Sequence, residues 1–168
     1  MEILNKMKKL YIIRHAKSSW KDLTLKDFDR PLNKRGKQNT SLMGTTLKEK
    51  NILPDMIISS PALRAKLTAK EIARIISFTK DIKFYENIYD ASSYDLIGIL
   101  KSIDDNNNSL FLFGHNPSLN SLAETFIGLY ENIPTCAIVE IEFDCNKWKD
   151  IDQTNANLVS FDYPKRYN

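Results

Sequence analysis

Three short, strongly apolar segments of this chain are each followed at once by polar groups suited to catalysis or anion binding. The segments are Leu10–Ile13, Met56–Ile58 and Leu110–Phe113, and they are followed by Arg14-His15, Ser59-Ser60-Pro61 and Gly114-His115. Segments this short and this apolar are typical of strands buried on both faces of a parallel sheet. Ligands of open α/β sheets bind beyond the carboxyl ends of the strands. The sequence therefore predicts one crevice that holds both histidines and binds an anion, best a phosphoryl group.

Helices are predicted between these apolar segments. Asn33 is a candidate N-cap for the first, over residues 33–50. Ser60 and Asn116, each followed by proline, are candidate N-caps for two more. Ser92 begins a capping-box pattern for a fourth. Strands that alternate with helices predict an α/β fold, a three-layer α/β/α sandwich with a mainly parallel central sheet and helices on both faces.

The remaining strands are predicted from shorter patterns. Ile82–Tyr85 is strand-like, Ala137–Phe143 alternates as a strand with one wet face, and Leu158–Tyr163 is a candidate edge strand. Residues 1–7 are expected to form a loose overhang. No repeat or linker interrupts the pattern, so we expect a single domain over residues 1–168.

Composition narrows the classes of function. A net charge of +3, spread along the chain, does not indicate a nucleic-acid partner. Cys136 and Cys145 match no zinc spacing and are interpreted as free thiols. No segment approaches the roughly 20 apolar residues of a membrane span, and Met1–Lys9 lacks the apolar core of a signal peptide. We therefore expect a soluble, cytoplasmic protein without a membrane partner.

Arg14 and His15 form the first candidate group. A neutral imidazole is a competent nucleophile toward phosphorus, and a guanidinium can clamp phosphoryl oxygens with two parallel hydrogen bonds. The alternative is a histidine at a strand end that is satisfied by a backbone carbonyl, beside a solvated arginine. Both interpretations fit the pair taken alone.

Arg64 and His115 form two further candidates. A helix N-terminus attracts anions, and Arg64 in a first turn opposes the helix dipole unless an anion binds there. The alternative is an exposed arginine paired with Glu71 or Asp55. His115 could stabilise charge on the transferring oxygens, or it could be a histidine near a helix cap without a ligand.

Four motifs together resemble those of the histidine phosphatase superfamily. They are Leu10–Ser18, Asp29–Gly36, Ser59–Ala69 and Gly114–Leu119. The motifs fit its SixA-like branch, the phosphohistidine phosphatases; phosphoglycerate mutases of the superfamily have glycine where this chain has Ala16. The resemblance implies a mainly parallel sheet with one strand reversed, and a phosphatase that needs neither metal nor cofactor.

The resemblance also implies roles for individual residues. His15 would be the phosphorylated nucleophile. The implied phosphate pocket consists of Arg14, Arg30, Arg64 and His115. In many members a carboxylate after the third strand is the general acid, and here Asp90 fits that pattern better than Glu86. A carboxylate in a solvated loop is the alternative for Asp90.

The leading hypothesis is a metal-independent phosphatase that hydrolyses a phosphate monoester or phosphohistidine through a covalent phosphohistidine on His15. Its partner would be a phosphorylated small molecule or a phosphohistidine-bearing protein. The chain has no long insertion that could form a lid, which favours an open site and argues against a mutase. A broad small-molecule phosphomonoesterase and a non-catalytic phospho-ligand binding module are the alternatives.

Overall fold

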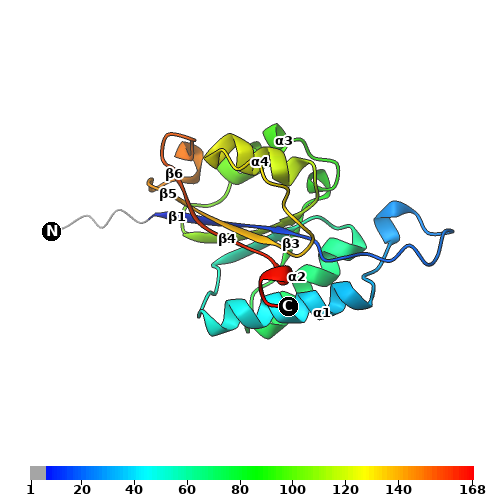
Figure 1. The fold of residues 1–168 in the computed structure, drawn as a ribbon. Coiled ribbons are helices and arrows are strands. Elements are labelled where there is room, and N and C mark those ends of the chain that lie inside the picture. The colour runs from blue at the N-terminus through cyan, green and yellow to red at the C-terminus, as the bar shows by residue number, and fades with distance from the viewer. Residues whose placement is uncertain (1–6) are drawn as a thin grey trace.

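A six-stranded mixed sheet forms the centre of the computed structural model, which describes residues 7–168 (Figure 1). The strands are β1 Lys8–Arg14, β2 Met56–Ser59, β3 Lys83–Phe84, β4 Ser109–Gly114, β5 Ile138–Phe143 and β6 Ala156–Asp162. The helices are α1 Lys34–Glu49, α2 Leu63–Ile75, α3 Ser93–Lys101 and α4 Ser118–Ile127. The overhang predicted for residues 1–7 lies, except for Met7, outside the described residues. None of the helices in residues 7–168 is long and apolar enough to cross a membrane.

The strand order is β3-β2-β4-β1-β5-β6. Strands β1 to β4 are parallel, whereas β5 runs antiparallel to both of its neighbours. The mainly parallel sheet with one reversed strand is therefore confirmed, as is the edge position of the last strand. The third strand is shorter than predicted, because β3 lies at the other edge and pairs only with Ile58 and Ser59 of β2.

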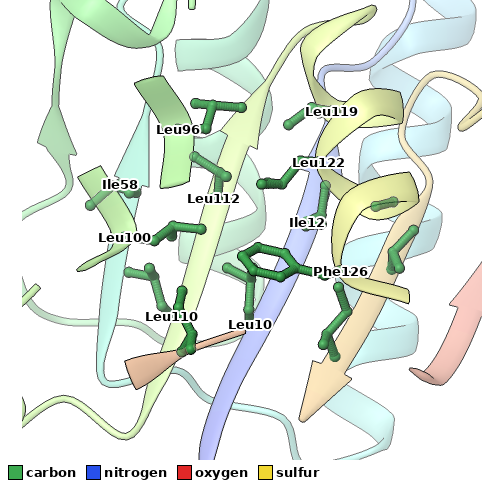
Figure 2. Packing of buried hydrophobic residues seen from close by; sticks show 14 of the residues in the cluster. Leu10, Ile12, Ile58, Leu96, Leu100, Leu110, Leu112, Leu119, Leu122 and Phe126 are labelled. Atoms are coloured by element: carbon green, nitrogen blue, oxygen red, sulfur yellow. The ribbon is translucent and has the colours of Figure 1, made fainter. Parts of the chain in front are cut away.

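Helices cover both faces of the sheet, which confirms the predicted three layers (Figure 1). Alternate residues of β1 face opposite sides: Leu10 and Ile12 belong to one apolar cluster, and Tyr11 and Ile13 to the other. Figure 2 shows the first cluster, in which leucines of α3 and α4 and Phe126 pack against β1 and β4. Burial on both faces explains why these strands are apolar throughout.

Two of the predicted helix starts are confirmed. The side chain of Asn33 accepts a hydrogen bond from the amide of Gly36 at the start of α1. Ser92 and Asp95 form a reciprocal capping box at the start of α3. Each cap satisfies amides that have no partner within their own helix.

The other two starts are wrong by one or two residues. Helix α2 has Ala62 as its N-cap, two residues after Ser60, and the hydroxyl of Ser60 lies 2.8 Å from the imidazole of His115. Helix α4 has Pro117 as its N-cap, and the side chain of Asn116 instead accepts from the amide of Asn120 at 3.2 Å. Both side chains still accept from a backbone amide at the start of their helix, Ser60 from Ala62 and Asn116 from Asn120, although neither is the N-cap residue.

Gly36 allows α1 to pack directly on the chain that follows β1. A Cβ atom at this position would overlap the carbonyl oxygen of Lys17, which is backbone and cannot rotate away. We expect Gly36→Ala to lower the free energy of unfolding by about 2 kcal/mol, in the range of other overpacked sites. The matched control is Gly98→Ala in α3, where a Cβ would meet nothing within 4 Å; it should raise stability by up to about 1 kcal/mol. Urea denaturation of both variants measures the difference, and equal midpoints would refute the close contact.

Candidate active site

The carboxyl ends of three adjacent strands bring the two histidines together. Strands β2, β4 and β1 are neighbours in the sheet, and Arg14 of β1 is in register with Gly114 of β4. His15 and His115 therefore leave the sheet side by side, with ring centroids 5.1 Å apart. This is the crevice geometry that ligands of such sheets use.

Both histidines line a pocket of about 260 Å³. Its lining residues are Arg14, His15, Lys17, Ser18, Trp20, Arg30, Arg64, His115, Asn116 and Thr135. All the residues that the resemblance assigns to phosphate binding are among them. The described lining carries several cationic side chains and no carboxylate, so its charge suits an anion.

The environment of His15 keeps its imidazole neutral and leaves one ring nitrogen with a free lone pair. Its Nδ1 lies 2.7 Å from the carbonyl oxygen of Ala16. Because a carbonyl can only accept, Nδ1 carries the proton and the lone pair lies on Nε2. Burial, reinforced by the charge of Arg64 and Arg14, lowers the pKa of His15 from 6.5 to about 4. The carbonyl contact that the alternative interpretation required is thus present, and it occupies one ring nitrogen only.

A threonine that sequence reasoning missed connects this histidine segment to α2. The hydroxyl of Thr68 accepts from the amide of Ala16 at 3.0 Å and donates to the carbonyl of Arg64 at 2.7 Å. The amide of His15 donates to the carbonyl of Gly114 on β4 at 3.1 Å. The backbone around His15 is therefore held from two sides. The available signal was a threonine among the apolar residues of the buried stripe of α2.

His115 presents an N–H group without a protein partner. The hydroxyl of Ser60 accepts from the amide of Ala62 at 3.2 Å and lies 2.8 Å from Nε2 of His115. The hydroxyl therefore donates its own proton in a hydrogen bond to Nε2, which acts as the acceptor, so the proton of the neutral ring is on Nδ1. That Nδ1 is buried and unpaired. Burial, with the charges of His15 and Arg64, lowers the pKa of His115 to about 3.

The two arginines nearest the histidines also have unused donors. Arg14 donates from Nη1 to the carbonyl of Ile133 at 2.9 Å. Arg64 donates from both Nη atoms to Asp27, at 2.7 and 3.0 Å. The Nε atoms of both are buried without a partner. Together with Nδ1 of His115, they are the unpaired buried side-chain nitrogen or oxygen atoms within residues 7–168. All three residues line the pocket. Since buried donors are costly to leave unpaired, this arrangement indicates a site for an oxyanion.

Asp27 holds the cationic side of the pocket, and sequence reasoning did not identify it. Its carboxylate accepts from the guanidinium groups of Arg30 and Arg64 and from the hydroxyl of Tyr89. The Tyr89 hydroxyl first, and then Arg64, lower the pKa of Asp27 to about 2. The spacing of Asp27 and Arg30, three residues apart, was the one local signal of this pairing.

The alternative interpretation of Arg64 is wrong. Arg64 is buried rather than exposed, and its carboxylate partner is Asp27. Glu71 instead pairs with Arg74 on the exposed side of α2 at 2.7 Å. Arg64 is therefore directed toward the pocket by a specific contact.

Arg30 is fixed from three directions. Besides Asp27, it donates to the hydroxyl of Ser18 at 2.6 Å. Its guanidinium lies 3.6 Å from the ring centroid of Trp20, a stacked cation–π arrangement. The plane of the guanidinium is thus set before a ligand arrives.

Asp90 is the one predicted site residue that the structure does not bring into this pocket. Together with Glu86 it lines a separate hollow beside the start of α3. Its assignment as general acid stays a prediction without support from this placement. Within residues 7–168, no group of three His, Cys, Asp or Glu side chains is arranged to hold a metal ion.

Comparison with known proteins decides the family. The sequence profile described as "Histidine phosphatase superfamily (branch 1)" matches residues 10–91. The crystal structure of SixA from Agrobacterium tumefaciens is 27% identical, with a TM-score of 0.80 over 94% of this chain and 98% of that one. The chain belongs to the histidine phosphatase superfamily. This histidine phosphatase is SixA-like in its motifs and in its fold.

Two further comparisons extend the likeness over most of the chain. The structure of the protein histidine phosphatase SixA complexed with tungstate shares the fold, with a TM-score of 0.81 and 19% identity over 95% of this chain and 99% of that one. An uncharacterized chloroplastic protein of Arabidopsis thaliana is 28% identical over 85% of this chain and 70% of its own length. The family and the similar structures together indicate that this protein is a phosphatase.

The lowered pKa values predict an unusual titration. The chain has two histidines, so an NMR titration of their ring carbons should show two signals. We expect the midpoint of His15 at about 4 and that of His115 at about 3, instead of 6.5. As pH falls from 6.5, the unfolded chain takes up protons that the folded one does not, so the free energy of unfolding decreases. A His15 midpoint near 6.5 would contradict a nucleophile kept neutral by burial.

Proposed function

We propose that the protein is a SixA-like phosphohistidine phosphatase that acts through a covalent phosphohistidine on His15, without a metal. The observation that carries this proposal is that three residues with an unpaired, buried N–H donor line the same pocket as the neutral imidazole of His15. Donors placed in this way can bind the oxygens of a phosphoryl group, and the imidazole can attack its phosphorus.

In the first step, the Nε2 lone pair of His15 forms a bond to phosphorus. The bond from phosphorus to the leaving group breaks, and the leaving group departs with that electron pair. The donors of Arg14, Arg64 and His115 stabilise the negative charge on the transferring oxygens. The carbonyl of Ala16 stabilises the positive charge that develops on the ring, through the Nδ1 proton.

In the second step, water attacks the phosphorus and the bond to Nε2 breaks. The electron pair returns to Nε2, water loses a proton to solvent, and orthophosphate is released. His15 is then neutral again, which its low pKa favours. Each turnover consumes one water and returns the enzyme unchanged.

The position of the carboxylates favours phosphohistidine over an ester as the substrate. Asp90 and Glu86 line a different hollow. The carboxylate of Asp27 is paired with two arginines, and its pKa is about 2, so it carries no proton to donate near neutral pH. An alkoxide leaving group needs a proton donor, whereas an imidazole that is already protonated leaves without one. SixA supports the same choice, since it is a protein histidine phosphatase and a tetrahedral oxyanion, tungstate, binds to it.

A substrate panel tests this function. Free phosphohistidine, a phosphohistidine-bearing protein, p-nitrophenyl phosphate and sugar and nucleotide phosphates are compared by phosphate release. We expect the phosphohistidine substrates to give the highest kcat/KM. Faster hydrolysis of sugar or nucleotide phosphates would instead support a broad small-molecule phosphatase. Binding of phosphate without any turnover would support a binding module.

A further inference from the structure

Building on the proposed phosphohistidine phosphatase activity, we propose that the 19–31 loop and the basic hollow at its base dock an acidic polypeptide that carries the phosphorylated histidine. The loop leaves the sheet after β1 and projects beyond the helices at the carboxyl end of that strand (Figure 1). Its two ends meet at an antiparallel bridge between Ser18 and Leu32, and Ser19 donates to the carbonyl of Pro31 at 2.8 Å. It therefore stands directly beside the pocket that contains His15.

The tip of the loop exposes apolar side chains. Leu23 is 84% exposed and Trp20 is 64% exposed, and Leu25 and Phe28 are partly exposed close by. Trp20 and Phe28 also contact Arg30 and Tyr89 within the protein, but Leu23 lies at the surface. Grouped apolar side chains on a surface, next to a polar site, are typical of a contact with a partner.

The loop and the start of α1 also concentrate the positive charge of the protein. Residues 17–37 contain seven Lys or Arg side chains and three Asp, a surplus of four, whereas the whole chain has a net charge of +3. The even distribution of charge inferred from composition is thus incorrect. All the rest of the chain together is slightly acidic. A partner that binds here is selected for negative charge.

Part of this charge surrounds a defined hollow. A concave site of about 490 Å³ adjoins the base of the loop, and its cationic lining residues are Lys21, Lys34, Arg35 and Lys37. Ser19 and Pro31 form its wall toward the loop. A hollow with several separate cations fits the discrete carboxylates of Asp and Glu side chains on a polypeptide. The apolar tip and this hollow therefore lie at the two ends of the same loop, the tip at its outer end and the hollow at its base.

The tip is held in shape before a partner binds. The carboxylate of Asp22 accepts from the amide of Thr24 at 3.0 Å and from its hydroxyl at 2.6 Å. This closed turn presents Leu23 at its centre. At the base, Asp27 ties the loop to Arg64 of α2. An ordered loop loses little conformational entropy on binding, which favours a specific contact.

A pair of phosphohistidine peptides tests the docking. Both have the same length, one phosphohistidine and one leucine; Glu flanks the phosphohistidine in one peptide and Lys in the other. We expect the wild-type protein to hydrolyse the Glu peptide with a kcat/KM about tenfold higher than that of the Lys peptide, and this preference should shrink in high salt.

Two variants test the loop and its hollow separately. Lys21→Glu should remove the preference by raising the KM for the Glu peptide. Leu23→Ser should lower kcat/KM for both peptides about fivefold. Free phosphohistidine should be hydrolysed at the wild-type rate by both variants.

Matched controls separate docking from general effects. Leu53→Ser removes an exposed leucine that precedes β2, at the amino end of that strand and away from the pocket at the carboxyl ends. Lys101→Glu reverses an exposed charge at the end of α3. Neither should change the ratio between the two peptides. Equal hydrolysis of the two peptides by the wild-type protein, or equal losses in control and loop variants, would overturn the docking proposal.

Three outcomes distinguish the docking proposal from the proposed function and from a membrane surface. If the protein hydrolyses free phosphohistidine but does not discriminate between the peptides, the docking surface is refuted and the proposed function stands. If it hydrolyses no phosphohistidine substrate, both proposals are refuted. Sedimentation with phosphatidylserine vesicles that is lost in Leu23→Ser, without peptide preference, would assign the loop to a membrane surface and overturn a polypeptide partner.

Discussion

Replacing His15 with alanine should abolish phosphoryl transfer. The substitution removes the proposed nucleophile, the Nε2 lone pair of His15, and leaves the arginine donors in place. We expect kcat to fall by at least about 10⁴-fold, as for other enzymes that lose their nucleophile. Phosphate release from free phosphohistidine measures the loss. Orthophosphate should still bind, because Arg14, Arg64 and His115 remain.

The covalent intermediate provides the control for this prediction. Brief incubation of the wild-type protein with labelled substrate, followed by denaturation in base, should leave label on His15, since phosphohistidine survives base and is labile in acid. The alanine variant should carry no label. Label on His115, or on any other residue of the wild-type protein, would contradict the assignment of the nucleophile.

Arg64→Ala should have the second largest effect. The substitution removes one of the three unpaired donors and also leaves Asp27 without its partner from α2. We expect kcat/KM to fall about 10²- to 10³-fold, the usual cost of losing a donor to a transition-state oxyanion. Inhibition by orthophosphate should weaken as well. Arg64→Lys retains the charge but not the planar fork, so it should restore activity only in part.

Arg74→Ala is the matched control for this substitution. Arg74 lies on the same helix, is exposed, and pairs with Glu71. Its replacement should leave kcat/KM unchanged. Asp27→Asn offers a second comparison, because it leaves Arg64 in place and removes only the charge that orients it; its effect should be smaller than that of Arg64→Ala. Equal activity of the Arg64→Ala and Arg74→Ala variants would show that Arg64 does not contact the substrate.

Much of the fold could be predicted because the strands are buried on both faces. A segment such as Leu10–Ile13 has apolar neighbours on either side of the sheet, so every residue must be apolar, and the segment is visible without alternation. The short edge strand β3 was overestimated because an edge position is set by its neighbour and not by its own residues. The N-caps at Ser60 and Asn116 failed for a related reason: distant partners compete for their side chains.

The residues of the pocket could be predicted where a strand end or a family motif marks them; Arg30, for example, was predicted from its motif alone and lines the pocket. His15, Arg64 and His115 follow apolar strands and match motifs. Asp27 lies outside the motifs, and Thr68 lies within one without a role assigned to it. Their partners are far along the chain: Asp27 is 37 residues from Arg64, and Thr68 is 52 residues from Ala16. Such contacts depend on the packing of α2 against the end of β1, which no local pattern of residues encodes.

The carboxylate that bridges two arginines also affects how the reaction ends. A phosphate dianion surrounded by uncompensated guanidinium groups would leave slowly, because the same attraction that stabilises the transition state retains the product. Asp27 already neutralises part of this charge, so the departing orthophosphate faces a weaker field than the number of arginines suggests. We therefore expect the protein to bind a phosphoryl group through directed hydrogen bonds and still to release orthophosphate before the next substrate binds.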